Sequence, residues 1–322
     1  MPRNSCVFAS LVFATIGLFA GSCAMAQDYP SRPIRLVAAN SVGTIPDLIA
    51  RVIGPEMSKF LGQPVIIENK PGANSLIAYE YVAKQVPADG YTFASAIAPD
   101  LASLPVTTKA LRFDPLKDLP PLIGLVRGRN AFGSSSKLPW KSFNELVAHA
   151  KANPGKLNYG AGATIVRLLA EALIREKGLD VIYVPYSGGA PYLNALASGE
   201  VQMGFLGASS AAAFGDRFRV LAITGEQRLA TFPDAPTFAE LGLPQFRGNS
   251  YSLNVPAGIP KIAFDKLYLA ASRALQQPEP KALFGKLGLE ITNETSETAA
   301  RTLADEAKFY ADIAQKIGIQ PQ

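Results

Sequence analysis

The sequence lacks most of the residue types that enzymes use as nucleophiles, bases and metal ligands. Its 322 residues include two cysteines, Cys6 and Cys23, and one histidine, His149. Both cysteines precede residue 27, so a chain that begins there can form no disulfide and no cysteine-bound metal site. One histidine is too few for the usual zinc site. The position of His149 late in a predicted helix fits a surface role, because a cation there suits the helix dipole.

Nucleotide and hydrolase motifs are missing as well. The sequence contains no G-x-x-x-x-G-K-[ST] loop, and the run at 160–165 lacks the third glycine of a dinucleotide turn. Ser209 and Ser210 have no second glycine at the place that a G-x-S-x-G elbow requires. We therefore expect no enzyme, no catalytic residue, no metal and no cofactor. A secreted α/β hydrolase is kept only as a remote alternative.

Charge is also sparse, because Asp, Glu, Lys and Arg make up 18% of the residues. The 31 basic residues exceed the 26 acidic ones only slightly and form no run of three. This distribution does not favour nucleic acid as a partner. The mild positive balance suits an anionic small molecule instead. No stretch after residue 26 is apolar enough to cross a membrane.

The N-terminus has the three parts of an export signal. Arg3 provides the positive start, residues 7–20 form an apolar run, and Ala24-Met25-Ala26 has the small-x-small spacing of a cleavage site. We expect a signal peptide over 1–26, cleavage after Ala26 and a periplasmic location. The apolar run is too short for a membrane anchor. Lipid attachment at Cys23 is the weaker alternative, because the leucine that opens such a box is missing.

The remaining sequence alternates between strands and helices, which predicts an α/β protein built from βαβ units with mostly parallel sheets. Short β-branched runs predict strands at 34–39, 65–68, 91–96, 181–184, 201–206 and 220–224. Ser142 and Glu145 form a capping box, and Gly178, Gly199 and Gly318 each follow a predicted helix. Turn residues at 120–133 and 244–250 suggest that the chain crosses twice between two domains. The predicted division is 27–124 plus 249–322 for lobe 1 and 125–248 for lobe 2.

Four strand-to-helix junctions are rich in small residues, and helix N-termini bind anions through free N–H groups and the helix dipole. At the first, Thr44 can cap a helix, Pro46 suits its first turn and Asp47 complements its dipole. Asp47 is explained by that structural role alone, although a functional one stays open. The other junctions are at 95–96, 160–164 and 185–189.

Arg167 is the most informative single residue. If Thr164 caps its helix, Arg167 falls in the first turn, where a cation is disfavoured by about 0.3–1 kcal/mol. A compensating partner is therefore expected. Glu171, four residues further on, is one candidate. A ligand carboxylate, which a guanidinium can hold with two hydrogen bonds, is the other, and the sequence does not decide between them.

An ordered set of motifs resembles the Bug-type solute receptors of tripartite tricarboxylate transporters. Each motif is weak by itself, but the set spans nearly the whole chain after residue 26 in the right order. The motifs are YPSRPIR at 29–35, GQPV at 62–65, ENKPGA at 68–73, DGYT at 89–92, VPYSGG at 184–189, LAIT at 221–224, PDAPT at 233–237 and PAGIP at 256–260.

The resemblance implies a two-lobed periplasmic-binding-protein (Venus flytrap) fold with a ligand cleft between the lobes. It also implies a monomeric receptor that captures a small carboxylate and delivers it to the membrane permease subunits of a tripartite transporter. A sensory receptor that docks on a membrane histidine kinase is an alternative. Loops carried over from the family join those found above to give one candidate set: Asn40, Ser41, Val42, Gly43, Thr44, Asp47, Ser95, Ala96, Ala161, Gly162, Ala163, Thr164, Arg167, Tyr186 and Ser187.

The chain departs from the family pattern near the expected cleft. Its first loop keeps only Gly43 and Asp47 of a glycine-rich P-G-G-x-x-D form. Arg167 stands where the family often has histidine, Ser187 where arginine is common, and Gln202 where aspartate is frequent. An arginine in the pocket suits a ligand with a second acid group, and Tyr186 or Tyr192 could stack on a ring. The expected ligand is a dicarboxylate, aliphatic or aromatic.

Overall fold

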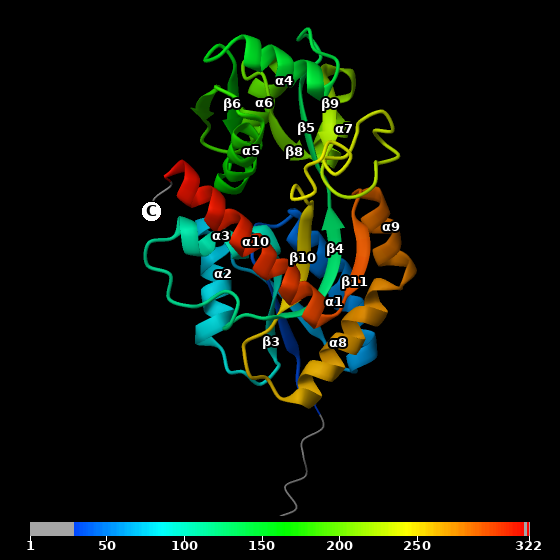
Figure 1. Cartoon of the computed structure of the whole chain (residues 1–322). Helices are drawn as coiled ribbons and strands as arrows, with labels where there is room; N and C mark the ends of the chain where they lie inside the picture. The colour runs from blue at the N-terminus through cyan, green and yellow to red at the C-terminus, as the bar shows by residue number, and fades with distance from the viewer. Residues whose placement is uncertain (1–28, 319–320, 322) are drawn as a thin grey trace, which may run out of the picture.

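The structure is a computed structural model that describes residues 29–318 and 321. The predicted signal peptide and its alternative lipid site at Cys23 lie outside the described residues. Figure 1 shows two lobes, one above the other, with the C-terminal helix α10 (Ser296–Ile317) running alongside both. Among the described residues, no helix combines the length and apolar character that a membrane span requires.

Lobe 1 is built on one six-stranded sheet. Its strands lie in the order β11-β4-β10-β3-β1-β2, so segments from the two ends of the chain meet in one sheet. The strands are β1 (Ile34–Ala38), β2 (Val65–Asn69), β3 (Thr92–Ile97), β4 (Pro121–Gly128), β10 (Asn249–Asn254) and β11 (Glu290–Glu294). The helical segments are α1 (Ile45–Leu61), η1 (Ala73–Ser75), α2 (Leu76–Glu80), η2 (Tyr81–Gln85), α3 (Ala98–Thr107), α8 (Lys261–Leu275), α9 (Pro278–Lys286) and α10.

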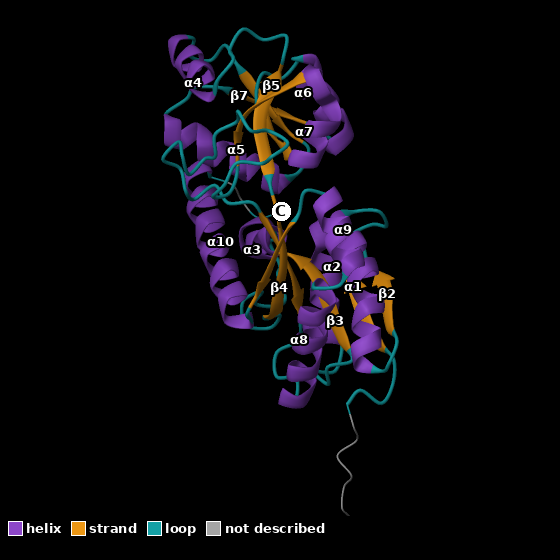
Figure 2. Ribbon diagram, turned by 90° about the vertical axis from the view of Figure 1, so that its right-hand side faces the viewer, coloured by secondary structure: helices purple, strands orange, loops and turns teal. Residues whose placement is uncertain are grey.

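Helices cover both faces of this sheet, as Figure 2 shows. In β1, Leu36 packs into a core shared with α1 and α8, whereas the next residue, Val37, packs into a core shared with α3 and α10. Alternate side chains of a strand point to opposite faces, so a strand buried on both sides must be apolar at every position. This explains the unbroken apolar run from Leu36 to Ala39, whereas Arg35, at the start of β1, is exposed.

Lobe 2 is smaller and holds two short sheets. One has the order β8-β5-β9 and the other pairs β6 with β7, and a parallel bridge between Tyr159 and Met203 joins them. The strands are β5 (Asn130–Ser135), β6 (Asn158–Ala161), β7 (Ile182–Pro185), β8 (Gly204–Gly207) and β9 (Phe218–Ile223). The helices are α4 (Phe143–Ala152), α5 (Thr164–Lys177), α6 (Gly189–Ser198), α7 (Ala208–Phe214) and the short η3 (Gly215–Arg217).

The α/β class and the two lobes are confirmed, but the prediction of mostly parallel sheets is wrong. Parallel pairing joins β1 to β2, β1 to β3 and β6 to β7, whereas β4, β5, β8, β9, β10 and β11 pair antiparallel. The crossings between the lobes explain the difference. The chain leaves lobe 1 along β4 and returns along β10, so these neighbours must run in opposite directions.

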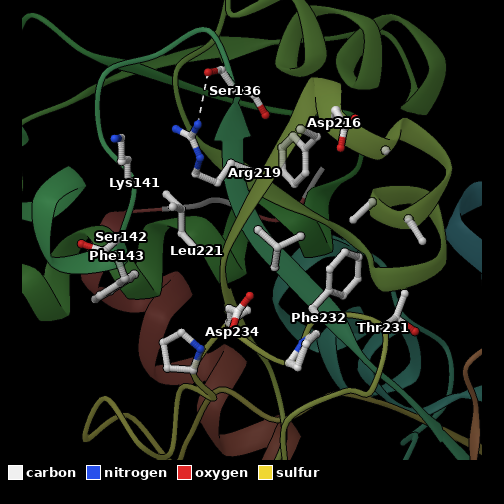
Figure 3. A pocket seen from close by; sticks show the side chains of 18 of the residues that line it. Ser136, Lys141, Ser142, Phe143, Asp216, Arg219, Leu221, Thr231, Phe232 and Asp234 are labelled. Atoms are coloured by element: carbon white, nitrogen blue, oxygen red, sulfur yellow. Dashed lines mark hydrogen bonds between the residues drawn. The ribbon is translucent and has the colours of Figure 1, made fainter.

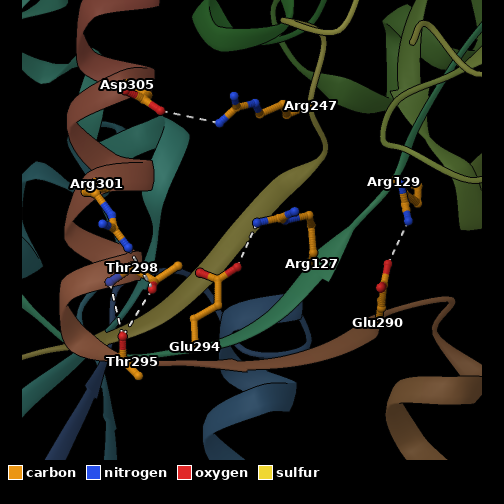
Figure 4. Close-up of polar contacts among 9 residues, drawn as sticks. All are labelled: Arg127, Arg129, Arg247, Glu290, Glu294, Thr295, Thr298, Arg301 and Asp305. Atoms are coloured by element: carbon orange, nitrogen blue, oxygen red, sulfur yellow. Dashed lines mark hydrogen bonds and ion pairs between the residues drawn. The ribbon is translucent and has the colours of Figure 1, made fainter. Parts of the chain in front are cut away.

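Ion pairs surround the crossings between the lobes (Figure 4). Arg127 in β4 binds Glu294 in β11 at 2.7 Å, and Arg129, between β4 and β5, binds Glu290 at 2.6 Å. The α10 helix packs on α3 of lobe 1 and on α5 of lobe 2. One hydrophobic core runs along these three helices, so α10 braces both lobes.

The predicted helix ends are largely confirmed. The Ser142 hydroxyl accepts a hydrogen bond from the Glu145 N–H at 3.2 Å, while the Glu145 carboxylate accepts one from Lys141 N–H rather than from Ser142. Gly178, Gly199 and Gly318 each end their helix in the left-handed conformation, where a glycine carries no steric penalty.

Candidate functional site

The carboxyl ends of strands from both lobes face one another. Because β10 pairs antiparallel with both β3 and β4, β3 runs toward lobe 2 as β4 does, and β1 is parallel to β3. In lobe 2, β8 and β9 run antiparallel to β5 and so back toward lobe 1, and β6 and β7 share the direction of β8. Ligands of open α/β sheets bind beside carboxyl ends of strands, so this junction is the natural candidate site.

A cavity of about 840 Å³ opens at this junction. Lobe 2 contributes the loop after β6, the start of α5, and two tyrosines from β7 and the loop after it. Lobe 1 contributes the turn before α2, the end of α3 and the end of α10. The lining residues are Ala73, Asn74, Leu76, Thr107, Thr108, Ala161, Gly162, Ala163, Thr164, Arg167, Tyr183, Tyr186, Ile317, Gly318 and Pro321.

Six of the predicted residues therefore line one cavity. They are Ala161, Gly162, Ala163, Thr164, Arg167 and Tyr186. Gly162 lies where the two lobe-2 loops cross, since a Cβ at this position would be 2.5 Å from the Gly188 carbonyl oxygen. Only a glycine allows this close approach. The predicted Ser187 lies in the same second loop, is exposed and does not line the cavity.

The predicted loop after β1 lies at the same junction but outside the cavity wall. Ser41, Val42 and Gly43 are exposed, and Val42 is 71% exposed. Thr44 is the N-cap of α1, but its hydroxyl donates to the Ser41 carbonyl oxygen at 2.7 Å instead of capping the helix. The Asn40 amide donates to the Ser75 hydroxyl at 3.1 Å, which links this loop to the turn that lines the cavity.

Asp47 is removed from the candidate ligand groups. Its side chain is 1% exposed and accepts hydrogen bonds from Gly43 N–H at 2.9 Å and from Asn69 at 2.8 Å. Arg51 completes the set with an ion pair at 2.9 Å. Burial alone would raise the pKa of this carboxyl, but these contacts together hold the pKa below its ordinary value. Asp47 is thus an ionised structural residue that fixes the first turn of α1.

The prediction that Ser95 and Ala96 contact a ligand with their side chains is also corrected. Both side chains are fully buried inside lobe 1, because β3 is covered by helices on both faces. The Ser95 hydroxyl donates to the Pro46 carbonyl oxygen at 3.2 Å and so fastens α1 to the sheet. Neither side chain can reach a ligand at the junction.

Three further details of lobe 2 differ from expectation. The N-cap of α5 is Ala163 and not Thr164, and no side chain caps this helix. Tyr192 cannot stack on a ligand, because it is 3% exposed and its hydroxyl donates to the Phe205 carbonyl oxygen at 2.7 Å.

Gln202 is likewise structural, since its side-chain oxygen accepts a hydrogen bond from the Asn158 N–H at 2.8 Å. Tyr186 stays at the cavity wall, with its hydroxyl 3.1 Å from the Glu200 carboxylate.

Arg167 lies one turn into α5 and reaches the cavity with its side chain 35% exposed. Its Nε forms the predicted i,i+4 ion pair with the Glu171 carboxylate, but at 3.8 Å, which is too long for a hydrogen bond. The guanidinium carbon lies 4.3 Å from the centre of the Tyr183 ring, within the range of a cation–π contact. Among the described residues that line the cavity, Arg167 alone carries a charge.

Sequence reasoning missed the lobe-1 wall of the cavity. Ala73, Asn74 and Ser75 have φ of 46°, 50° and 70°, a left-handed conformation that residues other than glycine rarely adopt. Such strained residues cluster at functional sites. The small residues at 72–75 were the available signal. Thr107, Thr108 and the end of α10 reach the cavity only through tertiary packing, so no local pattern marks them.

A second hollow of about 720 Å³ lies within lobe 2 (Figure 3). Its walls come from the start of α4, from β9 and from the segment 231–236, and none of the predicted residues lines it. The Arg219 guanidinium there is already engaged, since it donates to the carbonyl oxygens of Trp140 at 2.6 Å and Leu138 at 3.3 Å. Across the part of the chain that the structure describes, no cluster of His, Cys, Asp or Glu could hold a metal ion.

Comparison with known proteins agrees with this architecture. A family model described as "Tripartite tricarboxylate transporter family receptor" matches residues 49–319. A protein of Cupriavidus necator, "UPF0065 protein in gbd 5'region", is 35% identical over 311 residues, which cover 95% of this chain and 94% of that protein. BugT of Bordetella pertussis is 28% identical over 319 residues, covering 95% and 97% of the two chains.

A solved structure shows the same arrangement. It is described as R. palustris Rpa4515 with adipate, has a TM-score of 0.76 and 29% identity, and matches over 92% of this chain and 100% of that one. MatC from Rhodopseudomonas palustris with bound malate has a TM-score of 0.73 and 28% identity, over 89% and 100% of the chains. These matches extend over both lobes. The chain therefore belongs to the tripartite tricarboxylate transporter receptor family, whose members are periplasmic solute-binding proteins.

Proposed function

We propose that this protein captures a small carboxylate in the cavity between its lobes and delivers it to a membrane permease. The observation that carries the proposal is the character of the cavity wall. Among the described residues that line the cavity, Arg167 alone is charged, and the uncapped N-terminus of α5 lies beside it. A positive field and free N–H groups favour an anion over a neutral or cationic solute.

The ligand we propose is a dicarboxylate, aliphatic or aromatic. Adipate and malate, the acids bound to two structural neighbours, are both dicarboxylates. Tyr186 at the cavity wall offers a ring surface for an aromatic acid. The candidate contacts are the residues of the cavity, together with Ser41, Val42, Gly43 and the backbone of the other predicted loops.

Delivery requires that the receptor differ in shape when it carries a ligand. We propose two lobes, 27–124 with 249–322 and 125–248, that close on the ligand as hinged domains do. The first crossing lies a little later than this division, because β4 continues to Gly128. The closed form would be the surface that the permease recognises. We propose a periplasmic monomer that is exported by the signal at 1–26.

The first test is calorimetric titration of the exported protein, freed of bound ligand, with aliphatic and aromatic mono-, di- and tricarboxylates. We expect one saturable acid that binds at micromolar concentration or tighter and is recovered chemically unchanged. Cells that have the permease but lack this protein should take up less of that acid than cells that have both. Binding of amides or neutral aromatics in place of all acids would overturn the proposal.

A further inference from the structure

The charge of Arg167 is compensated within its own helix only by a long ion pair, 3.8 Å from its Nε to the Glu171 carboxylate. Arg167 follows the start of α5 by one turn, where the helix dipole disfavours a cation. Glu171, the residue placed to compensate it, accepts a hydrogen bond from the Tyr159 hydroxyl with the same Oε1 that lies 3.8 Å from Arg167 Nε. Arg167 Nε is buried and has no hydrogen-bond partner among the described residues.

The guanidinium is nevertheless held in one place. The Tyr183 ring lies against it, with 4.3 Å between the guanidinium carbon and the ring centre. Tyr183 and Arg167 both line the cavity, whose described lining includes no acidic side chain. A planar guanidinium fixed in this way presents a rigid pair of donors, the geometry that matches a carboxylate. A carboxylate in the cavity would therefore be a closer partner for the guanidinium than Glu171 is.

We propose that Arg167 is the specificity residue that binds the second acid group of a dicarboxylate ligand. The inference rests on the proposed function, in which the loops at the strand ends hold the first acid group. Arg167 lies about one helical turn, or ~5 Å along the axis, beyond the start of α5. The ligand class is therefore a diacid whose two carboxylates are separated by several bonds.

Matched pairs of acids test this role directly. Succinate against butyrate and adipate against hexanoate keep the carbon number and change only the second acid group. Calorimetry on the wild type should favour the diacid of the better pair by about 10- to 100-fold, the contribution of a charged hydrogen-bonded pair. In Arg167→Gln the diacid should lose that factor and the monoacid should not change. Arg167→Lys should retain part of the selectivity, because it keeps the charge and loses the planar fork.

Glu171→Gln is the matched control on the same helix face. It removes the neighbouring carboxylate and leaves Arg167 in place, so the preference for the diacid should persist. Thermal unfolding of each variant confirms that the lobes are folded. A ratio of diacid to monoacid affinity that is the same in wild type and in Arg167→Gln overturns the inference while the proposed function stands. A wild type that binds none of these acids and none of the aromatic and tricarboxylic acids of the wider panel overturns both.

Discussion

At the scale of single residues, Asp47 shows how a residue in a family motif can be structural. Its place in the first turn of α1 was predicted from the dipole, and the structure adds the buried contacts with Gly43, Asn69 and Arg51. The sequence could not reveal these contacts, because Asn69 lies in β2, a separate element from the helix that carries Asp47. Ser95 is a similar case, since its burial depends on helices that cover both faces of the sheet.

Replacing the Asp47 carboxylate tests this structural role. Asp47→Asn keeps the shape but removes the charge that Arg51 pairs with and one acceptor, so the free energy of unfolding should fall by about 2 kcal/mol. The control is Asp265→Asn, whose ion pair with Lys261 is on the surface, with side chains 56% and 85% exposed. That change should cost less than about 0.5 kcal/mol. Urea unfolding at neutral pH measures both.

The competing role for Asp47 predicts a different pattern. If its carboxylate contacts ligand, Asp47→Asn would weaken acid binding and cost no more stability than Asp265→Asn. Arg167 is the contrasting residue, because the dipole argument identified it from sequence and the cavity now surrounds it. The sequence left open whether Glu171 is the partner of Arg167. The Glu171 carboxylate also accepts a hydrogen bond from Tyr159, which lies in β6, so no pattern within α5 could answer that question.

At the scale of elements, the predicted strands are short runs rich in β-branched and other apolar residues. The runs at 34–39, 65–68 and 91–96 became β1, β2 and β3. The strands β4, β5, β6, β10 and β11 were missed. Polar residues such as Asn249, Ser250 and Asn254 interrupt the pattern of β10, and the prolines and glycines at 120–133 were interpreted as turn residues although β4 and β5 lie there. These strands are specified by pairing with distant segments, and β-propensity depends strongly on that context.

The crossing of the two lobe-2 loops gives a prediction at this scale. In Gly162→Ala the new Cβ would meet the Gly188 carbonyl oxygen at 2.5 Å, so one loop must move away from the other. We expect a loss of about 1–3 kcal/mol in stability and at least ~10-fold weaker acid binding, since the start of α5 moves with its loop. Thermal unfolding and calorimetry report the two effects.

Gly188→Ala is the control for this crossing. Its φ of 167° is extended backbone that alanine adopts freely, and a Cβ there meets no atom within 4 Å. This variant should match the wild type in stability. Equal behaviour of the two alanine variants would contradict the view that the close approach at Gly162 shapes the cavity.

At the scale of the whole molecule, two lobes follow from the resemblance, but the brace between them does not. The amphipathic pattern of α10 predicted a helix packed on a sheet, whereas the helix also contacts α3 and α5 and so joins both lobes. Its buried face contains Glu306, which is 8% exposed and has one carboxylate oxygen without a hydrogen-bond partner among the described residues. A buried acid at such a brace makes the stability of the whole fold depend on pH.

The direction of that dependence follows from the surroundings of Glu306. Burial raises the pKa of Glu306 to about 8 from the ordinary glutamate value of 4.5, although Arg127 and Arg247 act to lower it. A carboxyl that binds its proton more tightly when folded loses stability as pH rises from the unfolded to the folded pKa. Between pH 5 and pH 8 the free energy of unfolding of the wild type should therefore fall relative to that of Glu306→Gln, by at most about 4 kcal/mol.

The control is Glu297→Gln, which changes an exposed acid of the same helix, and its difference in stability from the wild type should stay constant with pH. Denaturant midpoints across this pH range measure the effect, and parallel curves for wild type and Glu306→Gln would mean that Glu306 is ionised in the folded protein, with Arg127 as its counter-ion.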